Sequence, residues 1–430
     1  MGKLHDKLAQ QIPGLREKVH SIIKEHGSTV ISEVTVSQAF GGMRGVKGLV
    51  CDTSVVEPDQ GLIIRGIPIG QLTQKLPEEI FYLLLTGALP DAQELASLQG
   101  DLRQRAAVPS YVWDVLKALP SDSHPMAMFS TAILAMERDS VFRRRYTEGL
   151  HKEEYWEAAL DDSLTLLARL PQIAAGIYRM HAHKGNPLPS NPNLDWGGDY
   201  ASMLHLEDPD GEFKNYIRLY LTLHCDHEGG NVSAFTCHTV GSALSDPFYA
   251  VSAGMNGLAG PLHGLANQEG LHFVLEIHKK YKGVPTDAQL SEYIRERLED
   301  GRVIPGYGHA VLRVTDPRFT AFHEFGLRVC PDDEIFRIVD QLFRVTPEIL
   351  KEHAKIKDPW PNVDAGSGAL LYLFGLKEFG YYTVLFGVSR ALGMCAQLVL
   401  NRALGTAITR PKSVSTPWIM QAISSSAKNV

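Results

Sequence analysis

The chain has 430 residues, 44% of them hydrophobic, so it is long enough to bury a sizeable core in two or three domains. Lys and Arg total 42 against 49 Asp and Glu, and the net charge of −7 excludes a general attraction to nucleic acid or to an anionic membrane. The five cysteines form no CxxC pair, which excludes a disulfide framework and a zinc ribbon and favours a reducing compartment.

Residues 1–20 are predicted to form the first helix. They mix basic and acidic side chains, and they have neither the apolar segment of a secretory signal nor the acid-free composition of a transit peptide. With Met1 directly before the fold, we expect a cytoplasmic protein of bacterial type. A mature protein of the mitochondrial matrix is the alternative.

Strand character is confined to residues 29–68. Valines alternate with polar residues at 30–36, and an apolar run bounded by Gly and Pro follows at 62–67. These two patterns predict one or two small β-hairpins rather than a sheet-based domain.

Helical periodicity dominates from residue 76 onward, as at 79–85 and 162–168, with Pro and Gly between the segments. The turn-rich stretch 183–197 is predicted to be an ordered surface loop. The expected fold class is therefore mainly α, with a small β-hairpin region near the N-terminus.

The longest apolar stretch, 383–403, is close to the length of a membrane span, but two polar side chains interrupt it. On a helical wheel, Arg390, Gln397 and Asn401 form a polar line beside an apolar stripe, which predicts a buried helix with one polar seam. A buried guanidinium must be paired. Its partner is either a protein carboxylate or a bound anion.

Four segments place titratable side chains beside Gly or Pro, where backbone can approach a small ligand closely. The first is HCDHEGGNVS at 224–233. We interpret His224 as a core histidine, because it continues the apolar face of the preceding helix. His224 and His227 lack the HExxH arrangement, so we predict no metal site.

The second segment, 257–269, places His263 in a GPLHG bend that opens a helix. A neutral imidazole at a helix N-terminus can donate a hydrogen bond to a developing oxyanion. Small residues that merely permit tight helix packing are an equally weighted alternative.

The third segment, 301–318, contains the sequence GYGHAVLR and then DPR. It lacks the third glycine of a dinucleotide fingerprint, but its Gly-x-Gly exposes backbone amides next to His309. Arg302, Arg313 and Arg318 flank it, so the loop is suited to binding phosphates or carboxylates.

The fourth segment, 355–368, carries Asp364 ahead of a helical run. An Asp at this position is either an N-cap or, in rigid apolar surroundings, a general base. Basic residues across these segments outnumber the acids beside them: Arg313, Arg318, Lys357, Arg390 and Arg410. This excess predicts a small polyanionic ligand.

Over essentially its full length the chain resembles the citrate synthase family, most closely its eukaryotic, mitochondrial type. The resemblance rests on five ordered blocks: DHEGGNVS at 226–233, GPLHG at 260–264, GYGHAVLR with DPR at 306–318, PNVDA at 361–365 and GVSRALG at 387–393.

The resemblance implies a mainly α homodimer with two domains. The large domain would comprise 1–264 and 377–430, and the small domain, 265–376, would close over the substrates. The reaction would be an acyl transfer that condenses acetyl-CoA with oxaloacetate and then hydrolyses citryl-CoA. By the same resemblance oxaloacetate binds first, and no cofactor is bound permanently.

The resemblance also assigns roles to individual residues. Asp364 would remove a methyl proton, His263 would hydrogen-bond the thioester oxygen, and His309 would polarise the ketone. Four residues would bind oxaloacetate: His227, Arg318, Arg390 and, reaching the site of the partner subunit, Arg410. Residues implied at the CoA site are Val303, Gly306, Gly308, Arg313, Lys357, Asn362 and, more weakly, Arg44.

Three alternatives remain open. Gly366 stands where we associate a His with the mitochondrial members, and extra room there would admit propionyl-CoA, as in a 2-methylcitrate synthase. A dicarboxylate or CoA sensor would keep the fold without turnover, although it would not need a general base. A metal-dependent lyase would lose activity on chelation.

Overall fold

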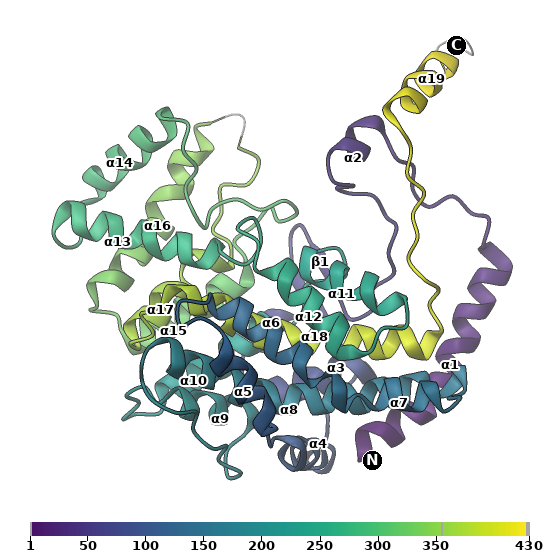
Figure 1. Cartoon of the computed structure of the whole chain (residues 1–430). Helices are drawn as coiled ribbons and strands as arrows, with labels where there is room; N and C mark the ends of the chain where they lie inside the picture. Colours follow the sequence, from purple (N-terminus) through teal and green to yellow (C-terminus); the bar gives the residue numbers. More distant parts are fainter. Residues whose placement is uncertain (1, 354–355, 427–430) are drawn as a thin grey trace.

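The computed structural model describes residues 2–353 and 356–426, and it places nineteen α-helices and three short strands in them. Figure 1 shows a layered helical body from which two segments extend, one carrying α2 and the other ending in α19. The expected mainly α fold class, with a small β region near the N-terminus, is confirmed.

The elements of the described residues have the following bounds: α1 Lys3–His26, α2 Val36–Phe40, β1 Ser54–Glu57, β2 Gly61–Ile64, β3 Ile67–Pro68, α3 Pro77–Thr86, α4 Ala92–Arg105, α5 Ser110–Ala118, α6 Pro125–Ala135, α7 Val141–Thr147, α8 Tyr155–His181, α9 Trp196–Leu204, α10 Glu212–Leu223, α11 Val232–Ser242, α12 Pro247–Leu258, α13 Ala266–Tyr281, α14 Asp287–Glu299, α15 Pro317–Val329, α16 Glu334–Lys351, α17 Ser367–Leu373, α18 Tyr382–Leu404 and α19 Thr416–Ser426. Short 3₁₀ helices lie at η1 Ile69–Gln71, η2 Met136–Asp139, η3 Lys152–Glu154, η4 Val363–Ala365 and η5 Phe379–Tyr381.

The predicted N-terminal helix is α1, which buries Leu4, Leu8 and Ile12 on one face and continues to His26. This i, i+4 spacing places the three side chains in one stripe along the helix. The helix uses that stripe to pack against α3, α4 and α18.

The strands form one antiparallel sheet in the order β1-β2-β3, with Val55 opposite Ile63. The hairpin predicted around 62–67 is therefore present, but the strand character predicted at 30–36 is wrong. Val30 is 76% exposed and the described residues provide no strand to pair with it. Thr35 and Gln38 instead form a capping box that begins α2, so local capping overrides the alternating pattern.

Helix α18 is the core of the body, where it packs against α8, α3, α11 and α12. The segment Phe379–Leu404 is long and apolar enough to cross a membrane, and 94% of its apolar window is buried inside the protein. This agrees with the prediction of a buried helix, and it leaves the polar seam facing other protein elements.

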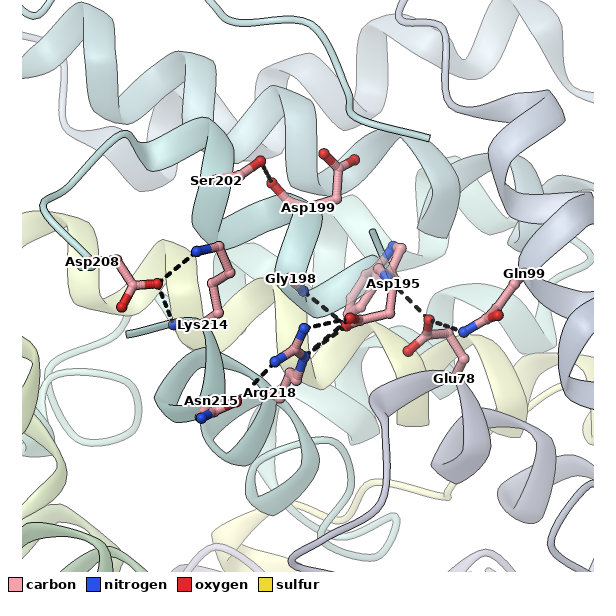
Figure 2. Close-up of polar contacts among 11 residues, drawn as sticks. Glu78, Gln99, Asp195, Gly198, Asp199, Ser202, Asp208, Lys214, Asn215 and Arg218 are labelled. Atoms are coloured by element: carbon pink, nitrogen blue, oxygen red, sulfur yellow. Dashed lines mark hydrogen bonds and ion pairs between the residues drawn. The ribbon is translucent and has the colours of Figure 1, made fainter. Parts of the chain in front are cut away.

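Buried polar contacts join α3, α4, α9 and α10 (Figure 2). The Trp196 N–H at the start of α9 donates to Glu78 Oε1 at 2.9 Å, and Gln99 donates to the same oxygen at 3.2 Å. Arg218 of α10 pairs with Asp195, the N-cap of α9, at 2.6 Å. Burial raises the pKa of the Glu78 carboxyl. These contacts fix α10, whose C-terminal end leads directly into the first site segment.

Candidate active site

Arg390, on α18, is a buried cation without a carboxylate partner in the described part of the chain. It is 2% exposed, and its Nε donates to the His224 carbonyl at 3.1 Å while Nη1 donates to Asn231 Oδ1 at 3.0 Å. Burial lowers its pKa to about 10, so the guanidinium stays charged at neutral pH. Of the two partners left open by the sequence, the geometry therefore favours a bound anion.

Asp226 lies close enough to act electrostatically on Arg390, but other groups occupy its oxygens. Thr53 and Ser54 donate to Oδ2 at 2.6 and 2.9 Å, and Gln397 donates to Oδ1 at 2.8 Å. These bonds hold the 226–231 turn against β1 and α18. Asp226 thus stabilises the backbone of the turn without forming an ion pair with Arg390.

Arg318 is the second buried guanidinium of this site, at 4% exposure. It pairs with Asp316, the N-cap of α15, with Nη2 2.7 Å from Oδ2 and Nε 3.1 Å from Oδ1. Burial alone would raise the pKa of Asp316, but the Arg318 charge and its hydrogen bonds hold that pKa below its usual value. Nη1 of Arg318 has no hydrogen-bond partner within residues 2–353 and 356–426, so it is free for a ligand.

His309 is held in one tautomer by backbone donors. The N–H groups of Val311 and Leu312 both donate to Nδ1 at 3.0 Å, so the neutral ring carries its proton on Nε2 and is a donor there. Burial and the Arg318 charge lower the pKa of His309, which keeps the ring neutral.

His227 lies beside His309, with ring centroids 5.9 Å apart. Burial, then the charges of Arg318 and Arg390, lower the pKa of His227 well below its usual value. The structure therefore brings two neutral imidazoles and two guanidiniums together, as the sequence predicted for these four residues.

His263 lies in the turn before α13, and its tautomer is also fixed. The backbone N–H of Ser233 donates to Nε2 at 3.3 Å, so the ring proton is on Nδ1. Burial and the Arg390 charge lower the pKa of His263 to about 4. The result is a neutral imidazole whose Nδ1–H remains to donate to a ligand oxygen.

Asp364 is not an N-cap. Asn362 caps the 3₁₀ helix Val363–Ala365 by accepting the Asp364 N–H at 3.0 Å, and α17 begins without a side-chain cap. The Asp364 carboxylate has no hydrogen-bond partner among the described residues. Burial raises its pKa to about 6, with Arg318 opposing the rise. A half-buried carboxylate with raised basicity is suited to general-base chemistry.

The loop 306–308 is bound tightly to the loop that carries Asp364. Asn362 donates from its backbone to the Gly306 carbonyl at 2.8 Å and from Nδ2 to the Gly308 carbonyl at 3.0 Å. Gly306 has φ +79°, and a Cβ there would lie 2.5 Å from Cα of Ala365. Only glycine permits this approach. Because both donor groups of Asn362 bind the loop 306–308, Asn362 links the two loops and is not free to bind a ligand.

Three further residues predicted at the CoA site lie on the surface near these loops. Val303 is 77% exposed, and Arg313 and Lys357 are exposed as well. The Arg313 guanidinium donates to backbone carbonyls of its own loop, among them Val311 at 3.0 Å. Their exposure leaves them accessible to a phosphate-bearing ligand.

Two predicted residues do not join this cluster within the chain. Arg44 follows α2, which stands apart from the helical body in Figure 1, and its carbonyl accepts a hydrogen bond from Gln38. Arg410 is exposed in the segment between α18 and α19, and it has no ion pair within the described residues. Neither position completes the site of its own subunit in this structure.

His224 is a buried residue of the core, as predicted. It is 1% exposed, its ring stacks on Tyr220 at 4.2 Å, and Nδ1 lies 3.0 Å from the Tyr220 carbonyl. Within the described ranges, no group of three or more His, Cys, Asp or Glu side chains is arranged to hold a metal ion.

The sequence interpretation missed the residues that orient the cluster, chiefly Asn231, Ser233 and Asp316. Two of the three had a local signal: Asn231 precedes a helix as its N-cap, and Asp316 stands before Pro317 at the start of another. The contacts of Asn231 with Arg390 and of Ser233 with His263 depend on tertiary approach, which no local pattern shows, whereas Asp316 contacts Arg318 within the same first turn.

This mainly α protein brings together guanidiniums, neutral imidazoles and one carboxylate without a hydrogen-bond partner among the described residues. Such a site defines a class of enzyme that binds a small carboxylate anion and moves a proton. Within that class, the chain belongs to the citrate synthase family. The family model for the citrate synthase C-terminal domain matches residues 42–412.

Similar proteins bear the same family name. The chain is 49% identical to the probable mitochondrial citrate synthase of Glossina morsitans morsitans, over 98% of this chain and 92% of that protein. It is 48% identical to the mitochondrial citrate synthase of Saccharomyces cerevisiae, over 96% of this chain and 88% of that protein.

Solved structures have the same fold. Citrate synthase from Pyrobaculum aerophilum matches with a TM-score of 0.78 and 28% identity, covering 90% of this chain and 95% of that one. Citrate synthase from Thermoplasma acidophilum, in a ternary complex with carboxymethyl coenzyme A and oxaloacetate, matches with a TM-score of 0.75 and 22% identity, covering 90% and 96%.

These comparisons correct one expectation. The cytoplasmic location expected from the N-terminal residues is wrong, because the similar curated proteins are mitochondrial citrate synthases and point to the mitochondrial matrix. The absence of a recognisable targeting pattern within the given residues carried no information about compartment.

Proposed function

We propose that this chain condenses acetyl-CoA with oxaloacetate and hydrolyses the resulting citryl-CoA to citrate and CoA, the entry step of the tricarboxylic acid cycle. One observation carries the proposal: the Arg390 guanidinium is buried with no carboxylate partner in the described residues, beside the neutral His263 and the basic Asp364. A dicarboxylate supplies the missing anion, and the base and donor act on the second substrate.

In the first step, Asp364 removes a proton from the methyl group of acetyl-CoA. His263 donates a hydrogen bond from Nδ1–H to the thioester oxygen, which gains electron density as the enol forms. A weakly acidic carbon requires both actions together, because base and oxyanion donor stabilise the same transition state.

In the second step, the enol carbon forms a bond to the ketone carbon of oxaloacetate. His309 polarises that ketone from Nε2–H. The ketone oxygen takes up one proton, which balances the proton that Asp364 removed from the methyl group, and becomes the hydroxyl of citryl-CoA. Arg318, Arg390 and His227 bind the oxaloacetate carboxylates, for which planar guanidiniums are well matched. Water then cleaves the thioester, and the steps require no resident cofactor or metal.

We assign the CoA site to the rim formed by Val303, Gly306, Gly308, Arg313 and Lys357, of which the two glycines are half-buried and the other three exposed. Gly306 packs against Ala365, the residue after Asp364, and the exposed Val303, Arg313 and Lys357 are accessible to a ligand, which supports the assignment. Asn362 links the loops of this rim. Arg44, which follows α2 on an extended segment, remains the weaker candidate for a CoA contact.

The proposal includes a small domain, residues 265–376, that closes over the substrates after oxaloacetate has bound. Closure would keep water away from the enol and from the thioester before condensation. Binding of a CoA thioester with full affinity in the absence of oxaloacetate would contradict this order.

We further propose a homodimer in which Arg410 binds oxaloacetate in the site of the partner subunit. Large apolar side chains are exposed on the two extended segments, including Phe40 at 69%, Ile408 at 62% and Trp418 at 54%. A surface of this kind is typical of a protein interface. A second copy of this chain would cover it.

The packing around Gly366 bears on the alternative of a 2-methylcitrate synthase. A Cβ at Gly366 would lie 3.3 Å from both the Phe319 ring and Val339, so neighbouring side chains already fill the space that a larger residue would take. These contacts support acetyl-CoA over propionyl-CoA as the substrate.

The test is thiol release by the purified protein with oxaloacetate and either acetyl-CoA or propionyl-CoA. We expect a strong acetyl preference in kcat/KM. Comparable use of propionyl-CoA would indicate 2-methylcitrate synthase, and no thiol release with either substrate would indicate a sensor. Asp364→Ala should lose turnover while retaining oxaloacetate binding, and chelation should leave activity unchanged.

A further inference from the structure

The polar line on α18 continues beyond the active site into a second cluster. Asn401, in the last turn of α18, has Nδ2 2.9 Å from Nδ1 of His238 on α11. The other ring nitrogen, Nε2 of His238, lies 2.8 Å from Oγ1 of Thr409. An amide donor on Nδ1 leaves the ring proton on Nε2, so His238 donates to Thr409.

Thr409 is attached to α11 at two points. Its hydroxyl accepts from His238, and its backbone N–H donates to Ser242 Oγ at 2.9 Å. His238 and Ser242 are four residues apart and therefore share one face of α11. We call the group Asn401, His238, Ser242 and Thr409 the α11 clasp.

The α11 clasp is the last hydrogen-bonded attachment before the chain leaves the helical body. Within residues 407–414, all of them described, Thr409 alone makes hydrogen bonds. Thr409 is half-buried, whereas Ile408 and Arg410 on either side are exposed. Figure 1 shows the segment rising away from the end of α18 toward α19.

Helix α11 therefore holds groups at both of its ends. Asn231 and Ser233 at its N-terminal end bind Arg390 and His263 of the active site. About 7.5 Å farther along the helix axis, His238 holds the residue next to Arg410.

We propose that His238 is a positioning residue that fixes Thr409, and with it the direction in which Arg410 leaves the subunit toward the partner's oxaloacetate site. This inference rests on the role proposed above for Arg410. His238 touches no substrate, and its effect is transmitted through Thr409 alone.

The test compares steady-state kinetics of His238→Ala and Thr409→Val with the wild type. Both variants remove the hydrogen bond, and Thr409→Val does so without changing side-chain volume. We expect KM for oxaloacetate to rise about tenfold, the lower range for a hydrogen bond to a charged group. At saturating oxaloacetate, kcat and KM for acetyl-CoA should stay within about twofold of the wild type, because the other site residues are untouched.

Thr239→Ala is the matched control. Thr239 is the neighbour of His238 on α11, it is exposed, and its hydroxyl donates only to the Phe235 carbonyl of the same helix, at 2.8 Å. Its kinetics should equal those of the wild type. His238→Gln, whose amide can still donate to Thr409, should recover part of the loss.

A double-mutant cycle with Arg410→Ala separates positioning from a general loss of structure. If His238 acts through Arg410, His238→Ala should add no further rise in KM to the Arg410→Ala variant. Additive effects, or an unchanged KM in both His238→Ala and Thr409→Val, would overturn the inference while leaving the proposed function intact. A wild type without thiol release would overturn the proposed function itself, and this inference with it.

Discussion

At the scale of single residues, burial sets the protonation states that the proposed chemistry needs. It lowers the pKa of His263 to about 4, with Arg390 adding to the effect, and it raises the pKa of Asp364 to about 6. At neutral pH the imidazole is therefore a hydrogen-bond donor without charge, and Asp364 is a carboxylate more basic than a solvated one. Both shifts favour proton removal from carbon.

The first prediction is an acidic limb in the pH dependence of kcat/KM. Asp364 must be deprotonated to act as the base, so activity is complete above its pKa of about 6 and is lost as the pH falls through that value. His263 stays neutral down to about pH 4 and should not contribute to this limb. Thiol release measured from about pH 5 to about pH 8, a range that spans this pKa, would reveal the acidic limb.

Asp364→Asn is the control for this assignment. It should lower kcat by about 10²- to 10⁴-fold, the usual contribution of a general base, and its residual rate should lack the acidic limb. An identical limb in the variant would assign the titration to another group.

At the scale of elements, the base is positioned by two loops that hold each other. Asn362 bonds the carbonyls of Gly306 and Gly308 while its Oδ1 accepts the N–H of Asp364. Gly306 contacts Ala365, the residue after the base, and its positive φ makes that contact possible. The predicted CoA loop and the predicted base are thus parts of one unit.

The second prediction uses two glycines with nearly the same backbone. Gly306 and Gly301 have φ of +79° and +73°, so alanine at either position costs about 1 kcal/mol of folding free energy. Only at Gly306 would the new Cβ press on Ala365; at Gly301 it would meet nothing within 4 Å. We expect Gly306→Ala to lower kcat by about 10²-fold through displacement of Asp364.

Gly301→Ala is the matched control, and it should lower the melting temperature slightly with kcat unchanged. Equal kcat values for the two variants would show that the packing against Ala365 does not position the base.

The sequence was sufficient to locate the site segments because Gly, Pro and titratable residues occur together there. It was not sufficient to decide between cap and base for Asp364, since that depends on whether the side chain of Asp364 or that of Asn362 accepts from the N–H groups of the first turn. The strand predicted at 30–36 failed for a related reason: alternation identifies a strand only when another strand lies beside it. That no carboxylate of the described residues pairs with Arg390 could be seen only from the packing around α18.

At the scale of the whole molecule, the role proposed for Arg410 requires a second subunit. The segment between α18 and α19, on which Arg410 is exposed, and the segment with α2 both extend from the helical body (Figure 1). Exposed apolar side chains such as Phe40 and Trp418 lie on the same two segments. A second subunit would explain both features, because it would bind Arg410 and cover the exposed apolar side chains.

The last prediction tests that arrangement with mixed dimers of Asp364→Ala and Arg410→Ala subunits, co-expressed with different affinity tags and purified through both. If Arg410 serves the partner, one site of the mixed dimer lacks both residues, while the other combines an intact Asp364 with an intact Arg410 from the opposite subunit. Such a dimer should have about half the wild-type activity, although each parent variant is severely impaired. If Arg410 served its own subunit, every site would lack one residue and the mixed dimer would be no more active than its parents. The activity of the purified mixed dimer thus reports directly which subunit Arg410 serves, independently of how much either substitution alone costs.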